Sequence, residues 1–201
     1  DEADEVEYDN QLGETWSNVS IDRIADGSGN PVWGVFFGSG YSSNNQENKQ
    51  AYLYGIFAND KSPLWYKDGV DINRIKLSAS ELLNDVTSPL MTADFQGDYI
   101  SDRIYVGNLY GTMFRVANIE NDETTPVVST LFDFAPSNTL PGVNPIRAKA
   151  TFAYGIKSDA EPYPIWIYYG TGKYQEQSDK TTMNMQYFFG LKDNFTQSSC
   201  Y

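Results

Sequence analysis

A nine-residue stretch, residues 94–102 (DFQGDYISD), carries oxygen donors at alternating positions. Asp94, Gln96 and Asp98 are separated by residues without a side-chain ligand, so a curled backbone would direct all three side chains at one centre. The backbone carbonyl of Ile100 and the carboxylate of Asp102 would then close the shell. Hard oxygen ligands of this number and charge suit Ca²⁺, and three carboxylates so close together would repel one another without a cation. The sequence therefore predicts a calcium loop with these five ligands.

The stretch does not have the complete pattern of an EF-hand loop. That loop needs glycine at position 6 and a bidentate glutamate at position 12, whereas Tyr99 and Tyr105 stand there in this chain. With fewer ligands we expect weak binding, with a Kd on the order of 10⁻⁶ to 10⁻³ M. The alternative is an ordinary acidic loop in which the aspartates cap turns.

Composition narrows the classes of function. The chain has 201 residues and a formal net charge of −13, which argues against nucleic acid as a partner and suits a cation or a basic partner. It has no histidine, which excludes Ser-His-Asp catalysis and His-ligated zinc or haem. The single cysteine, Cys200, is either a free thiol or forms a disulfide with another chain or with part of a longer precursor. No apolar run is long enough for a transmembrane helix.

From residue 12 onward, a pattern of short strands separated by turns repeats three times, and many tyrosines and glycines favour strands over helices. In the first unit, strands are expected at residues 16–24, 31–40, 51–57 and 63–66. In the second unit they are expected at 88–93, 103–111, 112–117 and 127–134. In the third unit they are expected at 147–156, 164–172 and 186–191. The third unit lacks a clear fourth strand. One helix is expected, over residues 74–83, in the link between the first two units.

Four short antiparallel strands per unit are typical of a β-propeller blade. The second strand of each unit is apolar on both faces, as expected for a strand between neighbouring blades, and its glycines allow positive φ where the chain turns. The predicted fold is all-β and propeller-like. We expect a partial propeller over residues 12–194, with blades at about 12–68, 86–134 and 146–193. A flexible acidic lead-in, residues 1–11, would precede it, and a tail, residues 195–201, would follow it. Because three blades do not close a ring, we expect the chain to share a larger ring or an oligomer.

Six segments resemble the C-terminal propeller of PilY1/PilC-type proteins, the family of type IV pilus-associated tip adhesins. They are LGETWS (12–17), FGSGY (37–41), DFQGDYISD (94–102), YVGNLYGTMFR (105–115), YGTGKY (169–174) and QYFFGLKDN (186–194). Each segment is short, but their order and spacing run along almost the whole chain. The chain departs from the family pattern at Gln96, where the family usually has Asn or Asp.

The resemblance implies a propeller with a regulatory calcium loop inserted in one blade. The family's ligand positions carry over onto Asp94, Gln96, Asp98, the carbonyl of Ile100 and Asp102. It also implies export through the periplasm to the cell surface or pilus tip, a part in pilus assembly and adhesion, and protein partners. Those partners would be minor pilins, other filament subunits or the rest of the propeller.

Two other functions remain open at this point. The chain could be a structural accessory subunit of an extracellular filament, with the loop as a stability clip. A quinoprotein-like propeller enzyme is the weaker alternative, because the sequence has no histidine and no visible cofactor-pocket signature. The sequence therefore favours a protein that is not an enzyme.

Overall fold

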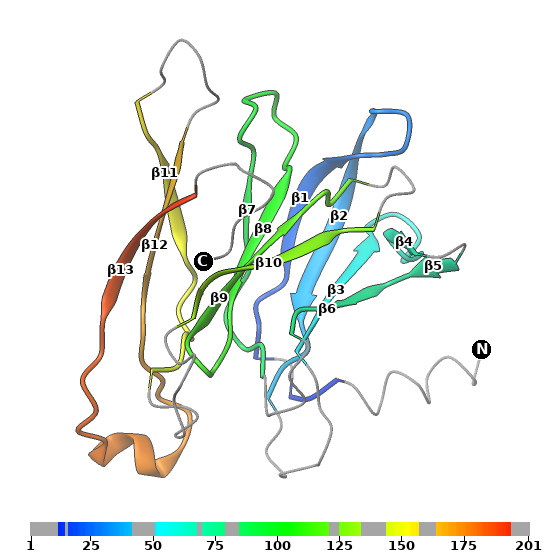
Figure 1. Cartoon of the computed structure of the whole chain (residues 1–201). Coiled ribbons are helices and arrows are strands. Elements are labelled where there is room, and N and C mark those ends of the chain that lie inside the picture. Colours follow the sequence, from blue (N-terminus) through cyan, green and yellow to red (C-terminus); the bar gives the residue numbers. More distant parts are fainter. Residues whose placement is uncertain are drawn as a thin grey trace.

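The computed structural model describes residues 12–14, 16–41, 51–67, 70–78, 85–120, 125–133, 144–156 and 164–193 (Figure 1). These residues form three antiparallel sheets and one two-stranded hairpin. The first sheet has the order β1 (Ser20–Ala25), β2 (Pro31–Gly38), β3 (Tyr52–Phe57) and β6 (Arg74–Lys76). The second has the order β10 (Val127–Asp133), β9 (Thr112–Ala117), β8 (Arg103–Gly107) and β7 (Met91–Ala93). The third consists of β11 (Thr151–Tyr154), β12 (Ile165–Gly170) and β13 (Phe188–Asp193).

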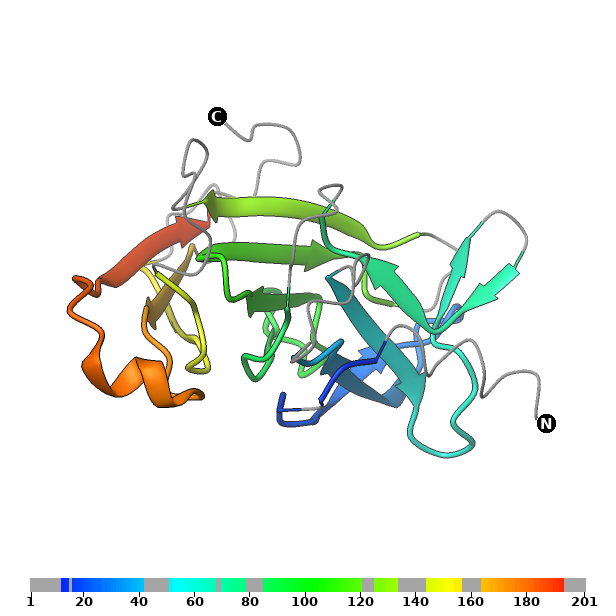
Figure 2. The same ribbon diagram turned by 90° about the horizontal axis from the view of Figure 1, so that it is seen from below.

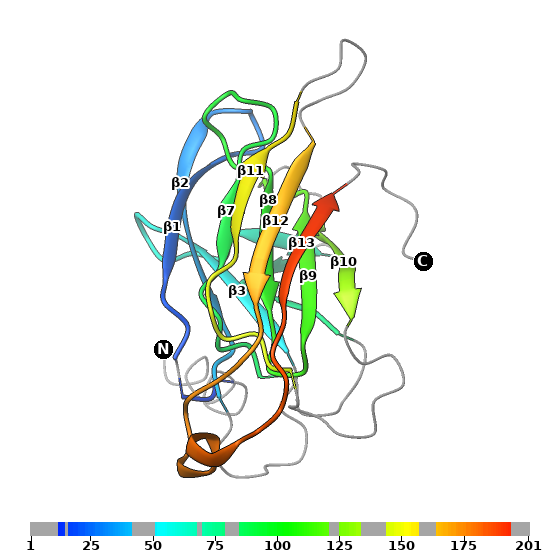
Figure 3. The same cartoon turned by 90° about the vertical axis from the view of Figure 1, so that its left-hand side faces the viewer.

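The three sheets stand side by side, with the second between the other two (Figures 2 and 3). One hydrophobic core lies between the first and second sheets and contains Phe36, Leu53, Ile104 and Val106. A second core lies between the second and third sheets and contains Met91, Tyr105, Ile146 and Ile167. The predicted all-β, propeller-like architecture is confirmed, including a third sheet with three strands among the described residues.

Only the middle unit has a second strand that is covered on both faces. Every residue of β8 is buried, because alternate side chains enter the two cores. In contrast, β2 and β12 each bury one face, and Trp33 and Trp166 on their other faces are 55% and 37% exposed. The outer faces of the first and third sheets are thus the two apolar ends of the stack.

The fourth strand of the first sheet was only partly predicted. Pro63 makes a single antiparallel bridge to Ile56 of β3, and the Leu64 N–H bonds to the Gly55 carbonyl. The residues after them leave that sheet, because β4 (Trp65–Lys67) pairs with β5 (Val70–Ile72) in a separate hairpin. The fourth strand is β6, which pairs with β3, so the first sheet extends beyond residue 68. The helix expected at 74–83 is therefore wrong over β6, where Ile75 enters the core as part of a strand. Residues 79–83 lie outside the described part of the chain, as do the lead-in at 1–11, the tail at 195–201 and Cys200.

Glycines follow the second strands for two different physical reasons. Gly40, Gly111 and Gly172 have φ angles of 87°, 89° and 123°, as the prediction of positive φ requires. Gly107 does not have positive φ, but a Cβ there would lie 2.3 Å from Cγ2 of Ile146. Glycine at this position allows the chain entering the third unit to pack directly on the second sheet.

In the described part of the chain one 3₁₀ helix, η1 (Gln177–Thr181), precedes β13. No described helix is long and apolar enough to cross a membrane. The segment around η1 also touches the first unit, because the Tyr41 hydroxyl donates a hydrogen bond to Glu176. This bond, together with the charge of Lys173, holds the pKa of Glu176 below its usual value. The bond raises the pKa of Tyr41 to about 12.

Replacing Tyr41 by phenylalanine should therefore raise the pKa of Glu176 towards its ordinary value. Since the folded-state pKa is lowered, Glu176 contributes stability above its unfolded pKa, and this contribution is lost as pH falls through the folded pKa. A titration of the side-chain carboxyl carbons by NMR measures the shift. The control is Tyr174→Phe, an exposed tyrosine of the same segment, and an unchanged Glu176 pKa in Tyr41→Phe would contradict the assignment.

Candidate metal-binding loop

The loop at residues 94–102 connects β7 to β8 in the middle sheet (Figure 1). Its base is closed by a backbone hydrogen bond of 3.0 Å from Asp102 N–H to the Ala93 carbonyl. Two residues with positive φ, Gly97 at 81° and Tyr99 at 68°, curl the chain between these ends. The curled backbone that the sequence predicts is therefore present.

The curl directs backbone N–H groups at the first carboxylate of the loop. Asp94 Oδ1 accepts hydrogen bonds from the N–H groups of Gly97 (2.6 Å) and Asp98 (3.3 Å), and its Oδ2 accepts one from Tyr99 (2.7 Å). Asp98 Oδ1 accepts the N–H of Ile100 at 3.0 Å. These bonds fix the loop shape and give the aspartates the turn-capping role that was the alternative interpretation.

The last carboxylate, Asp102, lies deeper, with 5% of the residue exposed. Its Oδ2 accepts the N–H of Phe95 at 3.0 Å, and its Oδ1 accepts a hydrogen bond from Gln96 Nε2 at 2.9 Å. Burial raises the pKa of Asp102, and the charges of Asp98 and Asp94 add to this effect against the two hydrogen bonds. The negative charge on Asp102 is therefore costly in this loop, and a bound cation would lower that cost.

The donor chemistry of the loop fits Ca²⁺, although the carboxylates do not converge. Among the described residues, no group of three or more Asp, Glu, His or Cys side chains is placed to hold a metal ion. The five predicted donors are all oxygens on one curled segment, and a carboxylate oxygen that accepts one N–H keeps a second lone pair. Coordination by Gln96 Oε1 and by Asp102 would compete with the hydrogen bond between these two side chains.

The loop contacts both neighbouring units. Ser101 donates its N–H to the Arg23 carbonyl of β1 at 2.8 Å, and its hydroxyl to Asp22 Oδ2 at 2.9 Å. From the third unit, the Tyr154 hydroxyl of β11 donates to the backbone carbonyl of Asp94. The loop thus joins all three sheets at one end of the stack.

A buried ion cluster next to the loop was missed in the sequence. Asp193, 1% exposed at the end of β13, accepts hydrogen bonds from Arg103 Nη1 (2.7 Å), Tyr105 Oη (2.6 Å) and Arg115 Nη1 (2.7 Å). Burial and the negative charge of Asp193 raise the pKa of Tyr105. The guanidinium of Arg103 also lies 4.3 Å from the centre of the Phe95 ring, inside the loop. The cluster therefore links the third sheet to the loop through the second sheet.

One signal in the sequence could have revealed this cluster. Arg103 and Arg115 interrupt apolar strands, and a buried arginine needs a carboxylate partner. The partner, Asp193, is 90 residues from Arg103 in sequence, so no local pattern identifies it.

The arrangement defines a β-propeller-like domain of stacked antiparallel sheets, two with four strands and one with three among the described residues. No family model matches the chain. Its sequence is 26% identical over 212 residues to the type IV pilus biogenesis factor PilY1 of Pseudomonas aeruginosa (strain UCBPP-PA14), covering 94% of this chain and 17% of that protein. It is 24% identical over 186 residues to a type IV pilus biogenesis factor PilY1 homolog of Xylella fastidiosa, covering 92% of this chain and 13% of that protein.

The fold agrees with these sequence matches. The crystal structure of the Pseudomonas aeruginosa PilY1 C-terminal domain matches with a TM-score of 0.67 and 21% identity, over 95% of this chain and 40% of that one. The resemblance that the motifs indicated is thus confirmed: the chain is similar along nearly its whole length to the C-terminal domain of PilY1-type pilus proteins. It spans less than a fifth of the curated relatives it matches.

Proposed function

We propose that this chain is a calcium-binding propeller module of a type IV pilus-associated protein, with a non-catalytic role in pilus assembly and surface adhesion. Ca²⁺ would be held by Asp94, Gln96, Asp98, Asp102 and the carbonyl of Ile100. The observation that carries the proposal is the position of the loop, whose neighbours come from all three sheets. An ion that ordered the loop would also fix how the sheets meet.

This role places the protein at the cell surface or pilus tip, and its partners among minor pilins or other filament subunits. The similarity to PilY1-type proteins supports a role related to pilus biogenesis. The two apolar outer faces of the stack, marked by Trp33 and Trp166, suit further blades that continue the ring.

Calorimetry and thermal unfolding of the whole chain test the calcium site. Added CaCl₂ should release binding heat, and at a hundredfold excess over Kd it should raise the free energy of unfolding by about 2.7 kcal/mol. Asp98→Asn keeps the side-chain size but removes one charge from the loop, and should weaken binding severalfold or more. The matched control is Asp71→Asn, an exposed aspartate on the β4–β5 hairpin, which should bind as the wild type does. No heat at millimolar CaCl₂ would refute the site.

A pull-down with purified minor pilins, with CaCl₂ or with EGTA, tests the role in the pilus. We expect retention that depends on calcium, because the ion would order a loop that joins three sheets. A calcium-dependent melting temperature without retention in either condition would instead favour the structural accessory subunit.

A further inference from the structure

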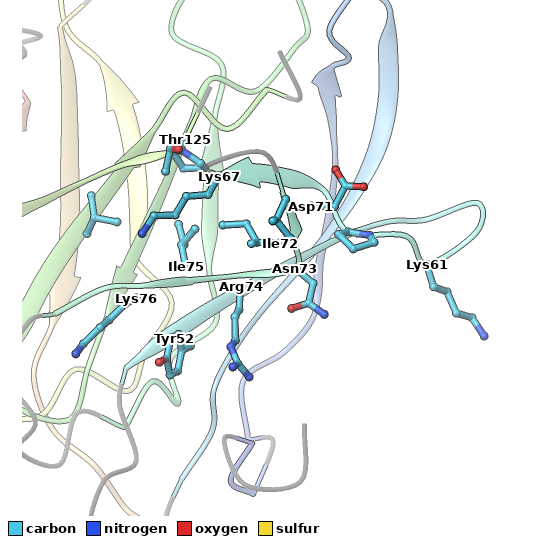
Figure 4. Close-up of a pocket in the computed structure, with 14 residues that line it drawn as sticks. Tyr52, Lys61, Lys67, Asp71, Ile72, Asn73, Arg74, Ile75, Lys76 and Thr125 are labelled. Carbon is cyan, nitrogen blue, oxygen red and sulfur yellow. The ribbon is translucent and has the colours of Figure 1, made fainter. Parts of the chain in front are cut away.

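An open groove of about 1030 Å³ lies at the outer edge of the first sheet (Figure 4). Residues of β3, the β4–β5 hairpin and β6 line it, together with residues of the segment 125–128. None of these residues belongs to the loop at 94–102, so the groove is independent of the calcium proposal.

The groove is basic, although the chain as a whole has a net charge of −13. The charged residues among its described lining are four cations and one carboxylate, namely Lys61, Lys67, Arg74, Lys76 and Asp71. The three lysines are exposed, and none of them forms an ion pair with another described residue. The guanidinium of Arg74 lies 5.1 Å from the centre of the Tyr52 ring, which holds it at the groove. The groove therefore favours a negatively charged ligand.

The edge of β6 that faces the groove offers backbone hydrogen bonds. On its other edge, β6 pairs with β3 between two bonds of 2.8 Å, one from Leu77 N–H to the Ala51 carbonyl and one from Gly55 N–H to the Asn73 carbonyl. Because hydrogen-bonded pairs alternate along an antiparallel ladder, the N–H and carbonyl of Lys76 face away from β3. Since β6 is the last strand of its sheet in the described part of the chain, these groups point to the side where another strand can add.

The two faces of β6 differ in chemistry. Arg74 and Lys76 are two residues apart and share the face on which Tyr52 lies, whereas Ile75 enters the first core on the opposite face (Figure 4). Side chains that are directly opposite one another on neighbouring strands share a face and contact each other. A strand that matches β6 would therefore place acidic side chains opposite Arg74 and Lys76, and an apolar side chain opposite Ile75.

We propose that the groove binds an acidic, extended segment of a partner protein, which adds to β6 as the next antiparallel strand of the first sheet. The segment alternates acidic and apolar residues, so that its carboxylates neutralise Arg74 and Lys76 while its backbone bonds to the N–H and carbonyl of Lys76. An apolar residue between the two acids packs over the apolar side of the groove, which Pro126 and Val128 line.

Charge and backbone together select a peptide as the ligand. A polyanion without amide groups, such as an acidic polysaccharide, would neutralise the cations but would not extend the hydrogen-bond ladder of the sheet. An apolar strand would extend the ladder but would leave the cations of the groove without carboxylates. An acidic strand satisfies both, because main-chain hydrogen bonds contribute affinity and the alternate side chains contribute specificity.

Hydrogen exchange of the Lys76 amide in the full-length chain tests the proposal, with a capped peptide Thr-Glu-Val-Glu-Thr as the probe. The buffer contains EGTA, so the result does not depend on calcium. At a peptide concentration about ten times its Kd, exchange should slow about tenfold, because it then proceeds from the unbound molecules. Two control peptides should leave the exchange unchanged. The first is Thr-Glu-Glu-Val-Thr, which points its two acids to opposite faces, and the second is the probe N-methylated at both glutamates, which cannot donate to the edge.

Reversing the charge of the groove tests the acidic preference. Arg74→Glu combined with Lys76→Glu should weaken binding of the probe by about tenfold or more, because like charges then lie opposite one another. The same variant should bind the capped peptide Thr-Lys-Val-Lys-Thr instead. The matched control is Lys192→Glu, an exposed cation on β13, which changes the net charge in the same direction and should bind the probe as the wild type does.

Three outcomes would overturn the proposal, and each of them can be observed with the wild-type protein alone. The first is slow exchange of the Lys76 amide without any peptide, which would mean that the edge is already covered. The second is equal binding of the probe and its N-methylated form, which would reduce the groove to a site for anions. The third is no change in exchange at millimolar probe, which would mean that no acidic strand adds to β6.

Discussion

Replacing Asp193 by alanine should lower the free energy of unfolding by about 3–5 kcal/mol, the cost of breaking a buried ion pair by removing one partner. The carboxylate accepts hydrogen bonds from Arg103, Tyr105 and Arg115 and is 1% exposed. Without it, two guanidinium groups with side-chain exposures of 9% and 12% remain close together and lose the carboxylate that both of them contact. Urea unfolding of the variant and the wild type measures the loss.

Two control variants distinguish the loss of the buried carboxylate from the loss of an exposed side chain or of one hydrogen bond. Lys192→Ala, at the exposed position beside Asp193, should change stability by less than about 0.5 kcal/mol. Tyr105→Phe removes one hydrogen bond and leaves both ion pairs, so it should cost about 1–2 kcal/mol. If Asp193→Ala cost no more than Tyr105→Phe, the cluster would not hold the second and third sheets together.

Asp193→Ala should also affect the proposed calcium loop. Arg103 stacks on Phe95 at 4.3 Å, and the Phe95 N–H bonds to Asp102. Once Asp193 no longer holds it, the Arg103 guanidinium can shift against the Phe95 ring in the loop. Phe95 bonds through its N–H to the predicted ligand Asp102. We therefore expect weaker calcium binding in Asp193→Ala, which the same calorimetry measures.

The second large effect is expected at Trp65, the buried anchor of the β4–β5 hairpin. Trp65 is 1% exposed, its ring centre lies 6.2 Å from that of Phe36, and it covers Gly55, where a Cβ would lie 2.5 Å from the indole. Trp65→Ala should lower the free energy of unfolding by about 3–5 kcal/mol, through lost burial and the cavity left behind.

Trp33→Ala is the matched control for Trp65. Trp33 lies on the outer face of β2 and is 55% exposed, so its removal from the isolated chain should cost less than about 1 kcal/mol. Thermal unfolding of both variants measures the difference. Equal losses would show that the hairpin is not anchored in the core between the first two sheets.

Much of the fold could be predicted from local patterns. The apolar segments ending in glycine correspond to β2, β8 and β12, because their composition favours strands whatever they pair with. The curled loop at 94–102 could also be predicted, because its oxygen donors and Gly97 lie within nine residues and its backbone shape is a local property. Its motifs further indicated the similarity to PilY1-type proteins that the comparisons confirm.

Other features depend on partners that are distant in sequence. Residues 74–76 were expected to be helical, yet Ile75 is a strand residue because β3 offers an edge to pair with and the first core accepts its side chain. The secondary structure of a three-residue segment depends on its neighbours in space, because their effect is larger than the weak intrinsic preference of the segment.

The sequence by itself determined the repeated strands, the acidic loop and its candidate ligands, because each is encoded in the spacing of neighbouring residues. Only the tertiary structure decided that Asp193 neutralises Arg103 and Arg115, that β6 pairs with β3 in the first sheet, and that the loop touches all three units. The ion pairs of Asp193 and the contacts of the loop join residues 60 to 90 positions apart. The packing of the sheets brings these residues together, and no local spacing in the sequence predicts that contact.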